Sequence, residues 1–271
     1  MARRRSLEDR LSRLEKFQYG FVKRSFEPGN FDHAIRWCQR TLGASWINYC
    51  TRNLTHFHGM DRLPELDPKK SYLCVSNHRS FFDLYVVTAH LVSAGMPHRL
   101  LFPVRANFFY DNPLGLMVNG LMSFFAMYPP VYRERQRQAL NLASLDEVVR
   151  LLKIGGAFVG LHPEGTRKKD GDPYTLLPAQ SGVGRIIHQS RVTVLPVFVN
   201  GLTNDFGKQI ADNAWRTGQK VVVVFGAPVD FGSLLDEAPS PRIYKQVSER
   251  ALSVIAGLGE EERVLRAAMG T

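Results

Sequence analysis

The stretch "SYLCVSNHRSFFDLYVVTAHLVSAG", Ser71 to Gly95, decides the fold. Its first part, "SYLCVSN", is a short apolar run of the kind that forms a buried strand. Its second part, "SFFDLYVVTAHLVSAG", is typical of a helix that ends at Gly95. A strand, a polar turn and a helix in succession form the repeating unit of α/β proteins, so we expect that class of fold.

The chain beyond this stretch repeats the alternation. Further strands are expected at 98–104, 157–162, 192–201 and 220–229, and further helices at 137–156, 181–190 and 241–259. This order predicts a largely parallel sheet flanked by helices. In such sheets, binding sites lie beyond the carboxyl ends of the strands.

Residues 1–55 have a different pattern. Apolar residues recur at helical spacing in two runs, which are Leu7, Leu11, Leu14, Phe17 and Phe21, and then Phe31, Ile35, Cys38, Leu42 and Trp46. The turn "EPGN", Glu27 to Asn30, separates them. The segment holds 11 Lys/Arg against 5 Asp/Glu. We therefore interpret 1–55 as an amphipathic membrane-docking segment and 56–271 as an α/β domain. The alternative is a helical hairpin packed on its own domain.

The bulk composition limits the classes of partner. The chain has 271 residues, 44% of them hydrophobic, and a net charge of +10, which favours anionic partners. No recognition helix or stacking motif supports nucleic-acid binding. The three cysteines form no CxxC pair, so a disulfide framework or zinc ribbon is not expected. No secretory signal or membrane-spanning helix is expected; the uncharged stretch Leu114 to Val131 should be core or press on lipid.

His78 and Asp83 lie five positions apart, between the first strand and helix of the predicted sheet. His56 and Asp61 have the same spacing, but no strand precedes them. Ser80 and Asp83 fit a capping box with Asp in place of Glu, which would turn Asp83 back towards the imidazole. A carboxylate on one ring nitrogen leaves the other nitrogen basic, so His78 is a candidate general base. Alternatively, the two are merely polar residues at a strand end.

Two further groups of residues carry possible chemistry. The turn "LHPEGTRKKDG", Leu161 to Gly171, follows a predicted strand and can hold a phosphate through backbone amides and a guanidinium. Three arginines, Arg105, Arg133 and Arg135, lie next to apolar stretches, which suits the binding of an anion near an apolar surface. The alternative for the turn is an ordinary polar turn at the surface. The alternative for the arginines is that they are only charges flanking an apolar stretch. His56 and His58 lack an evident third ligand, so no metal is expected.

Together these segments resemble a known family, the 1-acylglycerol-3-phosphate acyltransferases, within the wider glycerolipid acyltransferases. The family has four sequence blocks in fixed order, and the resemblance covers roughly residues 55 to 230. The first block, Asn-His with an aspartate five residues after the histidine, is matched by Asn77, His78 and Asp83. The second ends in arginine and is matched by Arg133, without the usual Ile-Asp before it.

The third and fourth blocks follow further along the chain. Phe-Pro-Glu-Gly-Thr-Arg is matched by Pro163 to Arg167, with His162 in the Phe position. The apolar strand with Pro and a closing Gly is matched through Pro196 and Gly201. Arg105 stands where the family often has Lys. The altered second block leaves the identity of the acceptor open.

The resemblance implies the glycerolipid acyltransferase fold and a reaction. A fatty acyl group would move from acyl-CoA or acyl-carrier protein to the free hydroxyl of 1-acylglycerol-3-phosphate, giving phosphatidate, without an acyl-enzyme and without a bound cofactor or metal. The implied roles are His78 as general base, Asp83 as its orienter, a phosphate-binding group of Arg105, Arg133, Glu164, Gly165, Thr166 and Arg167, and supporting residues Asn77, Pro163 and Pro196.

The resemblance also implies a location. Bacterial members dock on the membrane through an N-terminal two-helix element, which residues 1–55 resemble. We therefore expect a peripheral protein on the cytoplasmic side of an anionic membrane, the bacterial inner membrane. Two alternatives are kept. One is an acyltransferase for another lyso-lipid acceptor, and the other is a non-catalytic lipid-binding protein on the same fold.

Overall fold

A six-stranded sheet forms the centre of the molecule. The structure is a computed structural model, and it describes residues 11–132, 134–168 and 171–270. The strands lie in the order β1-β8-β7-β2-β6-β3. Their bounds are β1 Thr55–His58, β2 Tyr72–Ser76, β3 Arg99–Leu101, β6 Ala157–Leu161, β7 Thr193–Asn200 and β8 Val221–Phe225. Strands β7, β2, β6 and β3 run parallel, which confirms the predicted fold class.

The other two strands run in the opposite direction. β8 pairs antiparallel with β7, and β1 pairs parallel with β8. The carboxyl ends of β7, β2 and β6 therefore share one edge of the sheet, which the ends of β8 and β1 do not join. Both β2 and β8 are buried along their whole length, as expected for continuous apolar strands covered on both faces.

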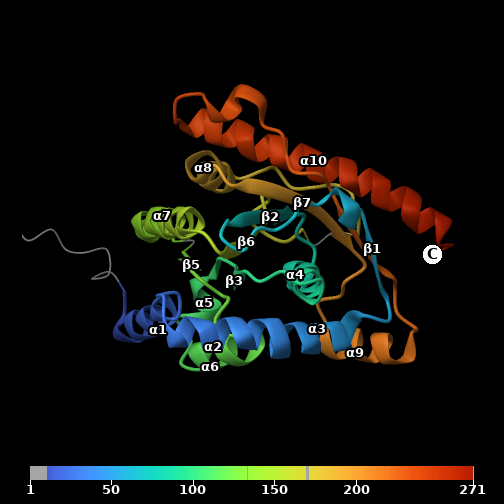
Figure 1. Ribbon diagram of the computed structural model, residues 1–271, viewed down its shortest axis with the longest axis horizontal. Helices are drawn as coiled ribbons and strands as arrows, with labels where there is room; N and C mark the ends of the chain where they lie inside the picture. Colours follow the sequence, from blue (N-terminus) through green and yellow to red (C-terminus); the bar gives the residue numbers. More distant parts are fainter. Residues whose placement is uncertain (1–10, 133, 169–170, 271) are drawn as a thin grey trace, which may run out of the picture.

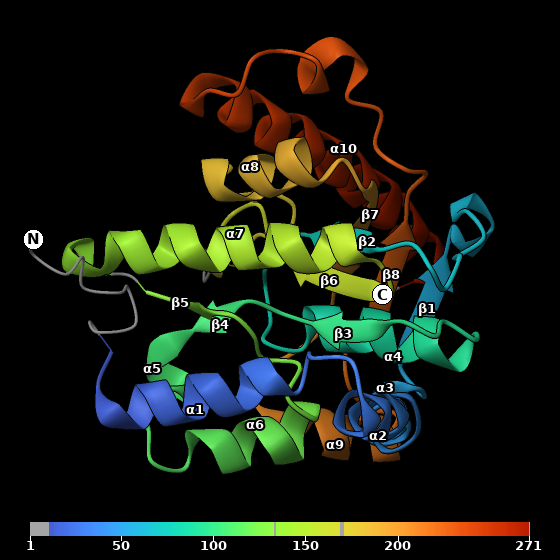
Figure 2. The same ribbon diagram turned by 60° about the vertical axis from the view of Figure 1, so that its left-hand side comes forward.

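Helices form layers on both faces of the sheet (Figure 1). One face is covered by α7 Gln138–Ile154, α8 Ser181–Ser190 and α10 Pro241–Ala268. The other face is covered by α4 Asp83–Ser93. Beyond α4 lies an outer layer made of α1 Arg13–Arg24, α2 Asn30–Cys38, α3 Ala44–Thr51, α6 Gly115–Ser123 and α9 Phe206–Trp215. Figure 2 shows the same outer layer from another side.

Short elements complete the chain. A two-stranded sheet pairs β4 Val104–Arg105 with β5 Pro130–Val131, next to α5 Ala106–Phe109. Single turns of 3-10 helix are η3 Met60–Arg62, η4 Arg135–Arg137 and η5 Gly232–Leu235. A π-helical turn, η2 Gln39–Gly43, joins α2 to α3, so the single helix expected over 31–46 continues to Thr51.

The N-terminal helices pack on the α/β domain by one face. Val22 and Ile47 are buried in the same core as the sheet. The Arg99 side chain of β3 is fully buried, with its Nε 3.3 Å from Asp32 Oδ1 of α2. Gln39 Oε1 accepts a hydrogen bond from the Leu100 amide at 2.9 Å. The described part of 1–55 is thus a packed hairpin, and the other face of its helices is free for other contacts.

Several features of the fold differ from the sequence-based expectation, and α10 extends beyond the expected 241–259 to Ala268. Residues 98–104 form no single strand, because β3 ends at Leu101 and β4 starts at Val104 in another sheet. The short edge strand β1, the apolar helix α6 and the helix α9 were not predicted. Within the described ranges, none of the helices combines the length and the apolar character needed to cross a bilayer.

Candidate active site

His78 follows β2, the central strand of the parallel group, at its carboxyl end. Its Nδ1 lies 3.4 Å from Asp83 Oδ2, and a proton on Nδ1 that points to this carboxylate leaves Nε2 with a free lone pair. The separation is long for a hydrogen bond. Burial lowers the pKa of His78 to about 3, and Arg167 adds to this effect. The imidazole is therefore neutral at physiological pH, which is the form a base requires.

Asp83 lies at the first position of α4 and is fully buried. Its Oδ2 accepts from the amides of Arg79 and Ser80, both at 2.8 Å. Burial raises the pKa of Asp83 to about 6, while His162 and these amides oppose the rise. The carboxylate therefore folds back on the turn that carries His78, as the spacing predicted.

The predicted capping box of Ser80 and Asp83 is only partly formed, because the Asp83 carboxylate accepts from the Ser80 amide but Ser80 is not the N-cap residue. The helix begins at Asp83, with Phe82 as its N-cap residue, rather than at Ser80. The Ser80 hydroxyl instead donates to the Thr203 carbonyl at 3.2 Å and accepts from the Phe82 amide at 3.2 Å. The hydroxyl thus ties this turn to the segment after β7.

A second imidazole lies against the first. The rings of His162 and His78 stack with their centroids 3.7 Å apart and their planes 8° apart. His162 Nδ1 is 2.9 Å from the Asn77 carbonyl and 3.1 Å from the Ser76 carbonyl, so this nitrogen carries the proton. Burial, and then His78, lower the pKa of His162 to about 3. Two neutral rings therefore face each other at the end of β2.

Glu164 holds the loops of the site together. Its Oε1 accepts from the His78 amide at 2.8 Å and its Oε2 accepts from the Leu177 amide at 2.7 Å. The side chain is buried, and burial raises its pKa, while the two amides lower it. Both oxygens are occupied by backbone, so Glu164 fixes His78 in place instead of facing a phosphate.

The supporting residues link neighbouring strands. The Asn77 side chain donates through Nδ2 to the Val199 carbonyl and accepts through Oδ1 from the Val199 backbone amide, both at 2.8 Å. These two bonds join the end of β2 to β7. The Pro163 carbonyl accepts from Gln180 at 2.7 Å. Pro196 lies within β7, beside Val75 of β2. These contacts set the spacing of the strand ends that carry the site.

Two of the predicted basic residues, Arg105 and Arg167, line the same pocket. Arg167 Nη1 donates to Asn204 Oδ1 at 2.6 Å, and Asn204 also contacts the Phe81 amide and the Arg79 carbonyl. Arg105, Thr166 and Arg167 line the same pocket as His78, and so does Gly165, which has a positive φ of 67°. Arg133 lies outside the described residues. Sequence analysis missed Asn204, although its place just after β7 matches that of His78 after β2.

The pocket has a volume of about 660 Å³ and is largely apolar. Its polar end holds His78, His162 and Arg167, and its walls include Leu84, Phe102 and Val118. This size and character suit a small ligand with a polar end and an apolar body.

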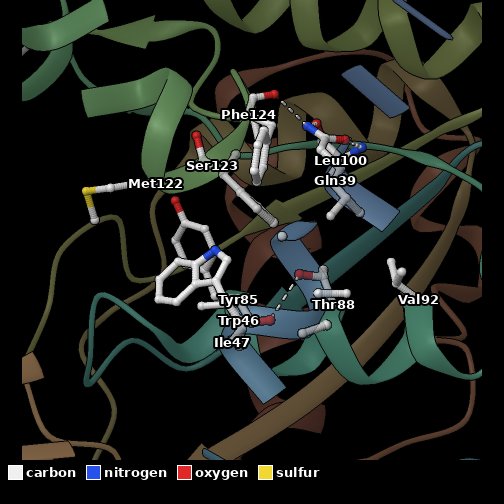
Figure 3. A pocket seen from close by; sticks show the side chains of 15 residues that line it. Gln39, Trp46, Ile47, Tyr85, Thr88, Val92, Leu100, Met122, Ser123 and Phe124 are labelled. Carbon is white, nitrogen blue, oxygen red and sulfur yellow. Dashed lines mark hydrogen bonds between the residues drawn. The ribbon is translucent and has the colours of Figure 1, made fainter. Parts of the chain in front are cut away.

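A second cavity, of about 20 Å³, shares Tyr85, Phe102 and Met122 with the pocket and lies beside the N-terminal hairpin. Figure 3 shows it, with Gln39 bonded to Leu100 and Phe124 along one side. The Tyr85 side chain is buried here.

One cluster in the described part of the chain has the residue types of a metal site. His78, Asp83 and His162 each place a ligand atom within 4.8 Å of the others. A zinc ion needs ligand lone pairs that converge on it, whereas the stacked rings direct theirs side by side. The cluster is better suited to moving a proton. His56 and His58 do not belong to it.

The other candidates have little support. His56 and Asp61 both lie in the described residues, where no hydrogen bond or ion pair joins them. Cys74 is fully buried, and burial raises the pKa of its thiol to about 12, which leaves it unreactive as a nucleophile. Two neutral imidazoles, those of His78 and His162, line the pocket, and His78 is the one with Asp83 beside its ring nitrogen.

Comparisons with known proteins identify a family for much of this chain. Residues 55–200 match the family model described as Acyltransferase. The chain is 31% identical over 147 residues to the chloroplastic 1-acyl-sn-glycerol-3-phosphate acyltransferase BAT2 of Brassica napus, covering 54% of this chain and 37% of that protein. It is 25% identical over 165 residues to the human 1-acyl-sn-glycerol-3-phosphate acyltransferase beta, covering 59% of this chain and 54% of that protein. The chain thus spans between about a third and about half of the length of these relatives.

A solved structure has a similar fold over most of the chain. It is the crystal structure of the 1-acyl-sn-glycerophosphate acyltransferase PlsC from Thermotoga maritima, with a TM-score of 0.58 and 21% identity. The match covers 91% of this chain and 89% of that one. The match shows that most of this chain has the fold of a known structure.

Proposed function

Because this chain belongs to the acyltransferase family, whose model matches residues 55–200, we propose that it moves a fatty acyl group from a thioester to a lysophospholipid. The acceptor is the free hydroxyl of 1-acylglycerol-3-phosphate and the product is phosphatidate. The observation that carries the proposal is the neutral His78 imidazole, backed by Asp83, at the polar end of a 660 Å³ apolar pocket.

The proposed reaction is a direct transfer. His78 Nε2 takes the proton of the acceptor hydroxyl while the oxygen attacks the thioester carbonyl carbon. The carbon–sulfur bond then breaks, and the imidazolium returns the proton to the leaving thiolate. Asp83 stabilises the imidazolium during the step. The high pKa of the buried Cys74 thiol supports a path without an acyl-enzyme.

The acceptor phosphate is assigned to the basic mouth of the pocket. Arg167 and Arg105 supply positive charge there, and Gly165 and Thr166 supply backbone and hydroxyl groups. Arg133 is kept in this role from its sequence alone. Glu164 is reassigned to positioning, because backbone amides already occupy both of its oxygens.

The donor is acyl-CoA or acyl-carrier protein, with the acyl chain in the apolar part of the pocket. Alignment of the two substrates beside a base is sufficient for the transfer, so the proposal includes no bound cofactor. The protein is peripheral, on the cytoplasmic side of an anionic membrane, the bacterial inner membrane. Support comes from aromatic residues exposed on the N-terminal hairpin, such as Phe17, Trp37 and Tyr49, beside its basic residues.

The experiment is acyl transfer by purified protein in mixed micelles. Lysophosphatidate is offered with acyl-CoA and with acyl-carrier protein in turn, and phosphatidate is measured. Lysophosphatidylcholine and a lyso-aminolipid serve as comparison acceptors. Phosphatidate as the main product is expected. Equal use of an acceptor without a terminal phosphate would overturn the phosphate assignment, and binding of lipid without turnover would show a non-catalytic protein.

A further inference from the structure

Helix α6 separates the apolar pocket from the outside of the molecule. Val118 and Met122 face the pocket, whereas Leu114, Met117 and Leu121 are exposed. No charged residue occurs between Asp111 and Arg133. A helix at a water-exposed surface normally turns its polar side to solvent, whereas α6 buries its polar residues Asn119 and Ser123 and exposes apolar ones. Its outer side therefore has the composition of a surface that is covered by apolar material.

The exposed apolar face of α6 continues onto the N-terminal hairpin. Phe125, just after α6, packs against Phe21 of α1 and Phe31 of α2, with ring centroids 5.4 Å and 6.4 Å away. Both Phe21 and Phe31 are themselves exposed. These segments are distant in sequence, yet Figures 1 and 2 show α1, α2 and α6 along the same side of the molecule.

Helix α9 extends this side at the far end of α3. The Asn213 side chain of α9 accepts from the Asn53 amide at 2.9 Å and donates to the Tyr49 carbonyl at 2.8 Å. These bonds fix α9 beside the end of α3. Trp215, at the last turn of α9, is 79% exposed. Tyrosine and tryptophan at the border of an apolar surface are typical of proteins that lie in a membrane interface.

Charge on the same elements indicates an anionic occupant. Exposed basic residues on α1–α3, α9 and their ends are Arg13, Lys16, Arg24, Arg40, Arg52, Lys208 and Arg216. On these elements and in the segments that join them, the exposed acids are far fewer. Anionic lipid headgroups, unlike a second copy of this basic chain, complement such a surface.

We propose that α6 and α9 lie in the surface of an anionic membrane together with α1–α3, so that α6 is the wall between the pocket and the lipid. The membrane contact is therefore a plane built from the whole outer layer and not from the N-terminal helices alone. Only the identity of the lipid substrate in the pocket rests on the proposed function. The contact itself is tested independently of turnover.

Two matched variants test the contact of α6. Leu121 and Val264 are each 70% exposed, but Val264 lies on α10, on the opposite side of the sheet. Leu121→Glu and Val264→Glu are compared by sedimentation with phosphatidylglycerol–phosphatidylcholine vesicles. We expect Leu121→Glu to weaken partition about tenfold and Val264→Glu to leave it unchanged. Equal binding of the two variants would overturn the proposal.

Turnover of the same variants separates this proposal from the proposed function. Leu121→Glu should keep wild-type turnover in detergent micelles and lose it on vesicles that contain lysophosphatidate. If Leu121→Glu weakens vesicle binding but the wild type transfers no acyl group, the proposed function is wrong and the proposed membrane contact is still supported. If sedimentation velocity shows a dimer that Leu121→Glu dissociates, a second copy covers the face and the membrane plane is wrong.

Trp215 tests α9 separately. Replacing Trp37 and Trp46 by Phe leaves Trp215 as the single tryptophan, since the chain has three. Vesicles made with brominated lipids should quench its fluorescence and shift the emission to shorter wavelength. Emission that stays unchanged on vesicles, while the variant sediments with them, would remove α9 from the contact plane.

Discussion

His78 depends for its orientation on groups that come from several strand ends. Asp83 holds its ring nitrogen, Glu164 holds its amide, and His162 covers one face of the ring. The sequence spacing predicted the first of these partners, because a helix start five residues away must return a carboxylate to the turn. It placed Glu164 and His162 in a turn at the end of another strand but not against His78, because that contact depends on β6 lying beside β2 in the sheet.

Removing the imidazole should abolish the reaction. His78→Ala is expected to lower kcat by about a thousandfold, since general base catalysis contributes roughly 10²–10⁴ in rate. Sedimentation with vesicles should not change. His33→Ala, an exposed histidine on α2, is the control. Turnover by His78→Ala close to that of this control would rule out the general-base role.

The pair should impose an acid limit on activity. The pKa of Asp83 is raised to about 6 by burial, and that of His78 is lowered, so Asp83 takes up the proton as the pH falls. A neutral Asp83 cannot stabilise the imidazolium. We therefore expect kcat/KM to fall below about pH 6 with loss of a single ionisation and to be flat above it. The Asp83→Asn variant should have a much lower kcat/KM, and its residual activity should not fall below pH 6. A fall that persists in this variant would assign the ionisation to another group.

At the scale of elements, strongly patterned segments were predictable and weakly patterned ones were not. The α8 bounds, Ser181–Ser190, match the expected helix, because apolar residues recur there at helical spacing. β1 is four residues long and only partly buried, so it has no apolar run to mark it. α6 buries Asn119 and Ser123 and exposes apolar residues, so it lacks the usual pattern of apolar residues facing inward.

The contact between α8 and α10 is set by one glycine. A Cβ at Gly184 would lie 1.8 Å from the Tyr244 carbonyl oxygen, whereas at Gly182 the nearest atom is a flexible Leu145 methyl at 3.7 Å. Gly184→Ala should destabilise the protein by about 3 kcal/mol, because the helices must separate. Gly182→Ala should be neutral or stabilise by roughly 0.5–1 kcal/mol, since alanine favours the helix. Thermal unfolding compares them, and equal melting temperatures would contradict this view of the contact.

At the scale of the molecule, the buried Arg99 joins the N-terminal hairpin to the sheet. Burial lowers the pKa of Arg99 to about 9, against the opposing effect of Asp32, so the guanidinium stays charged at neutral pH. The sequence alone suggested a boundary near residue 55, because composition changes there. The charge and periodicity of the sequence could not reveal that Arg99, on the edge strand β3, forms an ion pair with Asp32 of α2.

This pairing gives a prediction for stability. Asp32→Leu should cost about 3–5 kcal/mol in urea unfolding, because it leaves a buried guanidinium without its carboxylate. Adding Arg99→Met should restore most of that loss. Arg99→Met alone should cost less than Asp32→Leu, since Asp32 keeps Arg36, 2.7 Å away. Additive effects of the two changes would show that the hairpin is held by packing alone.

The strand order also has a consequence during synthesis. β2 is the centre of the parallel group, but β7 begins at Thr193, roughly 120 residues after β2 ends at Ser76. At a translation rate of roughly 5–20 residues per second, the apolar segment Leu73–Val75 leaves the ribosome roughly 6–25 s before its second neighbour exists. During that interval the nascent chain exposes an unpaired edge. A strand that is buried along its whole length in the folded molecule thus waits for a neighbour during synthesis.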